Sequence, residues 1–185
     1  SFLSIFLVSI TFFILSGLQR ALVLHMNTYF WALETSQIQY MFYAFFTSTV
    51  LVIPFVKYIM NWLDKKRTMY LGLSIILTSF VLPTILRLIG LFPENESPSL
   101  LPVLIISQIT TGFGMAIMVV GMGSIMADIA DNQELQNGKR QEGLIFSFIG
   151  LASKATSGVG HFLAGLALSL ISFPTTENVK PQDIP

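Results

Sequence analysis

Long tracts without charged residues dominate the hydropathy pattern of the chain. They cover Ser1–Gln19, Thr35–Val56, Thr68–Leu86, Ser97–Ala127 and Ala155–Thr176. A hydrocarbon core of roughly 30 Å is crossed by about 20 mostly apolar helical residues, and each tract supplies close to that number. Barrel strands alternate in polarity and cross in about 9–11 residues, unlike these continuous tracts. The pattern therefore predicts an all-α membrane protein.

Five membrane-crossing helices are expected, and Pro83 is expected to kink the third of them because proline lacks an amide proton. We place the helices near Phe2–Trp31, Gln37–Trp62, Thr68–Leu91, Leu100–Ala127 and Glu142–Ser172. Residues 173–185 are a polar stub, which we interpret as an outer loop. Residues 1–185 together are interpreted as a partial transmembrane domain of a larger protein.

Composition excludes several other classes of protein. Only 11% of the residues are charged, against about 25% in soluble domains. Ten Lys and Arg balance ten Asp and Glu, so no nucleic-acid surface is expected. The chain has no cysteine for thiolate chemistry. No nucleophile, base and orienting group fall together, and neither histidine has the His-Glu-x-x-His context of a zinc site. We expect neither an enzyme nor a metal site.

Basic residues occur in alternate loops. The second connection carries Lys57 and Lys65–Arg67, and the fourth carries Lys139 and Arg140, whereas residues 32–36 and 92–99 have none. Cytoplasmic loops are enriched in Lys and Arg, so the second and fourth connections are predicted to lie in the cytoplasm. Residue 1 is then cytoplasmic and the tail lies outside.

Lys154 is the most informative residue of the chain. It lies 12 positions after Glu142, about 18 Å along a helix and near the middle of a bilayer. A cation there costs roughly 2.5–3.5 kcal/mol on insertion scales, so it should face a cavity or a carboxylate. A stripe of small and polar residues at helical spacing surrounds it, formed by Ser147, Gly150, Ser157, Gly158, His161 and Gly165. The alternative is a structural lysine that joins two helices.

Arg20 and His25 interrupt the first helix. Arg20 and Asn27 are seven positions apart and share a face, where they are expected to line an outward cavity, while His25 points elsewhere. A plain hydrogen bond between helices is the alternative for Arg20. A structural role is also open for His161, which otherwise belongs to the cavity.

A resemblance to a known family lies between the fourth and fifth helices. Ser124-Ile125-Met126-Ala127-Asp128-Ile129-Ala130-Asp131 is followed by Glu134, Gly138, Arg140, Glu142-Gly143-Leu144 and Lys154. This segment resembles the signature of the glycoside–pentoside–hexuronide:cation symporters, the melibiose-permease-like branch of the major facilitator superfamily. Asp64-Lys65-Lys66-Arg67 resembles the acidic–basic loop motif of the superfamily.

The resemblance implies a half bundle of five helices, similar to helices 7–11 of 12. The missing N-terminal half and last helix would be partners, together with the lipid bilayer and a small solute. The implied function is cation-coupled symport of a sugar, glycoside or similar polar solute in the cell membrane, with Na⁺ or H⁺ as coupling ion and no other cofactor. Lys154 would lie in the central cavity, and a cytoplasmic gate would comprise Asp64, Arg67, Asp128, Asp131, Glu134, Arg140 and Glu142.

Departures from the family pattern leave other functions open. Asn132 replaces the usual Tyr, and the fourth helix has no Trp on which a sugar could stack. The chain also has 16 Phe. An amphipathic or lipid-like solute is therefore one alternative, and a membrane scaffold or sensor that transports nothing is another.

Overall fold

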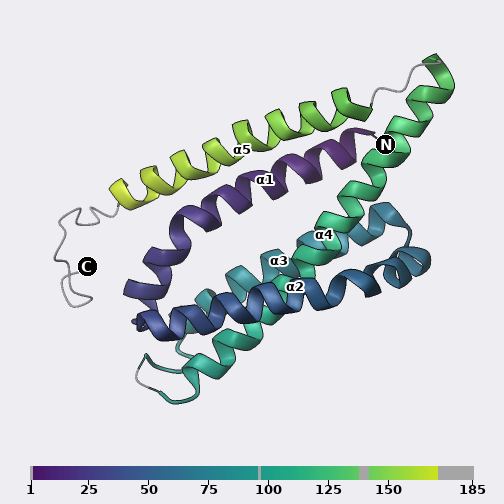
Figure 1. Ribbon diagram of the computed structural model, residues 1–185. Coiled ribbons are helices and arrows are strands. Elements are labelled where there is room, and N and C mark those ends of the chain that lie inside the picture. The colour runs from purple at the N-terminus through teal and green to yellow at the C-terminus, as the bar shows by residue number, and fades with distance from the viewer. Residues whose placement is uncertain (1, 96, 138–141, 171–185) are drawn as a thin grey trace. The chain divides into compact units, whose positions relative to one another are not determined.

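The computed structural model describes residues 2–95, 97–137 and 142–170, and the regular secondary structure within these ranges is helical, without a strand. Figure 1 shows five long helices: α1 (Phe2–His25), α2 (Thr35–Leu63), α3 (Lys65–Leu88), α4 (Leu100–Asn137) and α5 (Glu142–Leu170). A short π-helix, η1 (Met26–Phe30), continues α1. The all-α prediction is confirmed. Residues 173–185, expected to form an outer loop, lie outside the described part, as do residues 138–141, which include Arg140.

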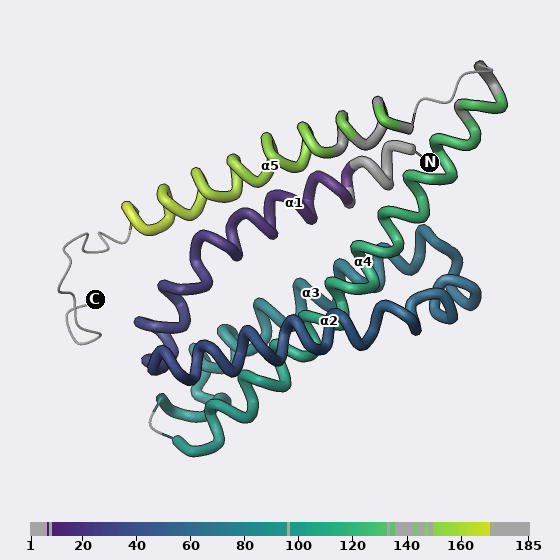
Figure 2. Tube along the Cα trace, viewed as in Figure 1, coloured from purple at the N-terminus to yellow at the C-terminus, as the bar shows by residue number. Residues whose placement is uncertain are grey.

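Two helices extend beyond their predicted range at one end, where charged residues continue the helix; α3 also ends at Leu88 instead of the predicted Leu91. We expected α3 to start at Thr68, but it starts at Lys65, where the Asp64 carboxylate accepts a hydrogen bond from the Lys65 amide over 2.7 Å. Such a cap stabilises a helix start. We expected α4 to end at Ala127, but it continues to Asn137. Figure 2 shows α4 as one long, continuous helix. Glu and Gln favour helix, so the helix persists beyond the apolar tract. Pro83 lies inside α3 and does not end it.

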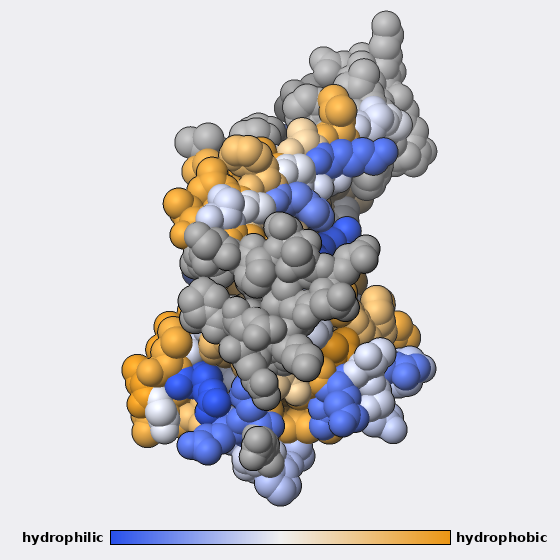
Figure 3. Space-filling model, turned by 90° about the vertical axis from the view of Figure 1, so that its left-hand side faces the viewer, coloured by the Kyte–Doolittle hydropathy of each residue, from blue (hydrophilic) through white to orange (hydrophobic). Residues whose placement is uncertain are grey.

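Four of the helices in the described part are long and apolar enough to cross a membrane. These spans are Ser9–Phe30, Thr35–Leu63, Lys65–Leu88 and Leu100–Asn132. Large apolar side chains remain exposed along them, as the orange surface in Figure 3 illustrates. Soluble monomers rarely expose apolar patches of this extent, so lipid is the environment that suits these helices.

The described helices belong to two compact units. Residues 1–38 and 148–185 contain α1, η1 and most of α5, while residues 39–147 contain most of α2 together with α3 and α4. In the first unit α5 packs on α1 through glycine. A Cβ built on Gly160 would lie 2.6 Å from the Leu18 nitrogen and 2.9 Å from the Gly17 carbonyl carbon. The two backbones therefore meet directly, as small residues allow in membranes.

In the second unit α4 packs on both α2 and α3. A Cβ on Gly114 would lie 3.0 Å from the Gly72 carbonyl oxygen of α3. On the α2 side, the Thr49 hydroxyl donates to the Gly112 carbonyl over 3.2 Å. The core of this unit contains Val56 and Ile117, both fully buried. Close helix contacts therefore fix α4 against both of its neighbours.

The connection from α1 to α2 is a compact turn. Trp31 and Leu33 donate their amides to the carbonyls of Met26 and Asn27, each over 2.9 Å. Ala32 has a φ of 50°, a left-handed conformation that is uncommon outside glycine. Asn27 and Trp31 are buried here. The helix that we expected to reach Trp31 thus ends at Phe30, and its last 5 residues are π-helical.

Candidate functional site

Lys154 lies near the middle of α5, and its side chain is exposed. Gly150, Gly158 and Gly165 follow at helical spacing on the same side, and a Cβ added to any of them would meet no atom within 4 Å. His161 is exposed as well, with its Nδ1 hydrogen-bonded to the Ser157 carbonyl over 2.8 Å. The helix therefore presents the ammonium group beside an open, glycine-rich surface.

The residues of the predicted stripe around Lys154 fall into two groups, one that packs on α1 and one on the open side of the helix. Ser157 packs on α1, because a Cβ on Gly17 would lie 2.8 Å from the Ser157 Cα. Its hydroxyl donates to the Lys154 carbonyl of its own helix over 3.1 Å. Ser147, at the other end of the stripe, is exposed. The sequence indicated one polar surface, whereas the structure assigns Ser157 to helix packing and leaves Lys154 on the open side.

Arg20 and Asn27 lie in different environments. Arg20 is exposed on α1, whereas Asn27 is buried in η1 with 4% of its surface accessible. The wider turn that begins at Met26 interrupts the α-helical spacing on which the shared face depended. The structure therefore does not bring these two predicted cavity residues to one surface.

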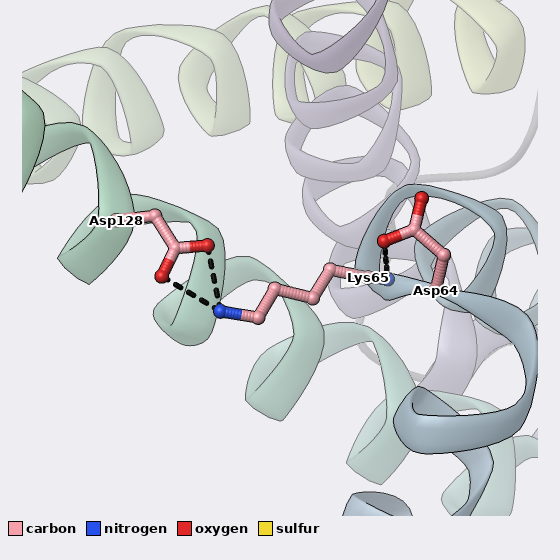
Figure 4. Close-up of polar contacts among 3 residues, drawn as sticks. All are labelled: Asp64, Lys65 and Asp128. Carbon is pink, nitrogen blue, oxygen red and sulfur yellow. Dashed lines mark hydrogen bonds and ion pairs between the residues drawn. The ribbon is translucent and has the colours of Figure 1, made fainter.

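An ion pair joins the start of α3 to α4. Lys65 Nζ lies 2.7 Å from Oδ1 and 2.6 Å from Oδ2 of Asp128 (Figure 4). The side chains are 37% and 55% exposed, so water screens the attraction and the pair is worth about 0.2–1 kcal/mol. Asp64 caps the start of α3, the helix from which the Lys65 side chain extends toward Asp128.

The remaining gate residues are placed less closely together. Arg67, Asp131 and Glu134 are exposed, the last two on the part of α4 that the sequence assigned to a loop. Glu142 begins α5, but its side chain, like all of Arg140, lies outside the described part. Lys65, which the predicted gate omitted, is the residue that contacts Asp128. In the sequence, the acidic–basic run Asp64–Arg67 indicates a charged contact at this loop. The run alone does not show which of its cations faces α4.

A double-mutant cycle should detect the Lys65–Asp128 pair. Replacing both residues by Ala in the full-length protein should reveal a coupling of about 0.5 kcal/mol in the free energy of unfolding, and salt should weaken it. Lys66 is the matched control, because its ammonium lies 5.9 Å from the Tyr70 ring centre instead. A Lys66–Asp128 cycle that showed the same coupling would contradict a specific pair.

Metal ligation has little support in this part of the protein. Within the described ranges no group of three or more His, Asp or Glu side chains is placed to hold a metal ion. The described part offers an exposed ammonium group on α5 and an ion pair between α3 and α4.

These features define an integral, multi-pass membrane protein, and comparison with known proteins gives its family. Residues 1–184 match the family described as MFS/sugar transport protein. The chain belongs to this family, in agreement with the resemblance found in its charged motif.

Two curated relatives are symporters by name. An uncharacterized symporter of Synechocystis sp. is 30% identical over 68% of this chain and 21% of its own length. The sodium-dependent lysophosphatidylcholine symporter 1 of Gallus gallus is 25% identical over 80% of this chain and 26% of its own length. The chain thus spans about a fifth to a quarter of these relatives. No solved structure matches it.

Proposed function

We propose that the protein containing this chain is a cation-coupled symporter that moves a sugar, glycoside or similar small polar solute by alternating access. The observation that carries the proposal is the exposed Lys154 in the middle of α5. Lipid contact at that depth is unfavourable for an ammonium group. The side chain therefore needs a watery cavity or an anionic partner from the rest of the protein, and a carrier supplies both.

The coupling ion, Na⁺ or H⁺, requires residues from outside this chain. The acidic residues of the described helices lie outside the uncharged tracts, as Asp64 and Asp128 do. Carboxylates that hold the ion would therefore come from the missing N-terminal half. Lys154 would compete with the ion for them, so that binding of one changes the affinity for the other.

The ion pair of Lys65 with Asp128 supports a cytoplasmic gate in the same proposal. Exposed pairs of modest strength can be exchanged for others when helices rearrange. Asp131, Glu134 and Arg140 would provide the exchange partners. No catalytic step is part of this function.

A lipid-like solute is the second candidate. The relative from Gallus gallus is named for lysophosphatidylcholine, and the helices of this chain expose many Phe side chains. In this case Lys154 would contact the phosphate of the solute.

Uptake by the full-length protein in liposomes tests both candidates. Methyl glycosides and lysophosphatidylcholine should be offered separately under a Na⁺ gradient, a proton gradient and no gradient. Gradient-dependent glycoside uptake supports the proposal, while lysophosphatidylcholine uptake alone supports the second candidate. Protein that accumulates neither and shows no change in accessibility would be a scaffold or sensor.

A further inference from the structure

The exposed face of α2 carries uncharged polar side chains in the half nearer its N-terminus. Gln39, Tyr40, Tyr43 and Thr47 are all exposed, with Tyr40 and Tyr43 more than half accessible. Positions 40, 43 and 47 share a face because they follow at intervals of three and four. Gln39 Nε2 donates to the Tyr43 hydroxyl over 2.5 Å. We refer to these four residues as the polar row.

α2 packs on α4 through a different side of the helix. Ser48 and Thr49 each donate to the Phe45 carbonyl of their own helix, and Thr49 also reaches the Gly112 carbonyl of α4. These hydroxyls are therefore satisfied within the helix contact. The polar row takes no part in that contact and needs a different explanation.

Lipid does not explain the polar row. Hydroxyl and amide groups that face hydrocarbon lose hydrogen bonds to water, which is unfavourable. A tyrosine near a helix end can sit among the headgroups, which suffices for Tyr40. Thr47, however, follows the first residue of α2 by 12 positions, about 18 Å along the axis. At that depth Thr47 lies level with the hydrocarbon region. Water or a polar ligand would supply the hydrogen bonds that lipid does not.

The charge pattern indicates the chemistry of such a ligand. Between Glu34 and Lys57 no residue of α2 carries a charge. Amide and hydroxyl groups both donate and accept hydrogen bonds, and tyrosine adds an apolar ring face. This combination suits a neutral molecule rich in hydroxyl groups better than the charged headgroup of a lysophospholipid.

We propose that Gln39, Tyr40, Tyr43 and Thr47 line a water-filled section of the translocation pathway and bind a neutral, hydroxyl-bearing solute. The inference rests on the proposed transport function and selects between its two solute classes. Lys154 would then contribute to coupling from α5, while the polar row provides the uncharged contacts that select the solute.

Cysteine labelling tests the proposal in the full-length protein. This chain contains no cysteine, so single replacements here need only a background in which cysteines elsewhere are removed. Tyr43→Cys and Thr47→Cys report on the polar row. Phe42→Cys and Phe46→Cys are matched controls, because their apolar side chains are exposed at nearly the same depth and border the polar row on the side of Gln39. The probe is a membrane-impermeant, negatively charged methanethiosulfonate, and uptake by the cysteine-free parent is measured in parallel.

We expect the two polar-row cysteines to react faster than both controls. A mixture of methyl galactosides, glucosides and xylosides at about ten times the Kd should slow that reaction about tenfold, since it fills most sites. Equal rates at all four positions, or protection by lysophosphatidylcholine but not by the glycosides, would overturn the inference. Fast labelling that neither solute slows would overturn it too.

Failure of the inference can be told from failure of the transport function. Coupled uptake by the parent with an unlabelled polar row refutes the assignment of these residues alone. A parent that takes up neither solute refutes the transport function itself. Thr47→Cys is a small change, so it carries the test if Tyr43→Cys does not reach the membrane.

Discussion

Replacing Lys154 by Ala in the full-length protein should lower the initial rate of cation-dependent uptake by about 10- to 100-fold. Hydrogen bonds to charged groups contribute about 1.5–3 kcal/mol, which corresponds to that range of rates. The ammonium group is exposed on the open side of α5, so its removal should leave the packing on α1 unchanged. The measurement is gradient-driven solute uptake in liposomes, normalised to the amount of protein.

Two variants control this result. Lys154→Arg keeps the positive charge and should retain part of the coupled uptake. Leu151→Ala removes an exposed apolar side chain one turn earlier on α5 and should leave uptake near the parent value. Unchanged coupled uptake in Lys154→Ala would remove the main support for the proposed mechanism, and equal losses in Leu151→Ala would point to a packing effect.

Gly160→Leu should strongly destabilise the protein, by at least about 3 kcal/mol in the free energy of unfolding. The Cβ alone would overlap the Ile14 carbonyl oxygen and lie 2.6 Å from the Leu18 nitrogen. These are backbone atoms, which cannot turn aside as a flexible side chain can, so α1 and α5 would have to separate. Thermal denaturation of the purified full-length protein measures the effect, and Gly160→Ala should give a smaller loss.

Gly158→Leu is the matched control on the same helix. Gly158 is exposed, and an added Cβ would meet nothing within 4 Å. Leucine also favours helix over glycine by about 1 kcal/mol, so stability should be kept or slightly raised. If Gly158→Leu were as damaging as Gly160→Leu, the close approach of α5 to α1 would not be the cause.

Helix number and membrane class could be predicted from the sequence because both follow from the length of apolar tracts. The ends were less predictable where charged residues continue a helix into water. Asp128, Asp131 and Glu134 are polar enough for a loop, yet their part of α4 is helical to Asn137. Hydropathy reports the membrane boundary, whereas helix propensity and caps decide where the helix stops.

The candidate site was predictable only in part. Lys154 was found because a charge in an apolar tract is conspicuous. The partner of Asp128 required the geometry, since three adjacent cations, Lys65–Arg67, were available and only one faces it. The polar row of α2 was missed because uncharged polar residues hardly alter the hydropathy. Their common exposure appears only once the packing side of the helix is known.

The length of α4 has a mechanical consequence. Its 38 residues extend about 57 Å, nearly twice the roughly 30 Å of a hydrocarbon core. The nine residues that follow Asp128 extend about 14 Å beyond the apolar tract, and tilting them by about 10° would swing their tip by about 2 Å. The segment after Asp128 can thus act as a lever that amplifies small rotations among the membrane helices.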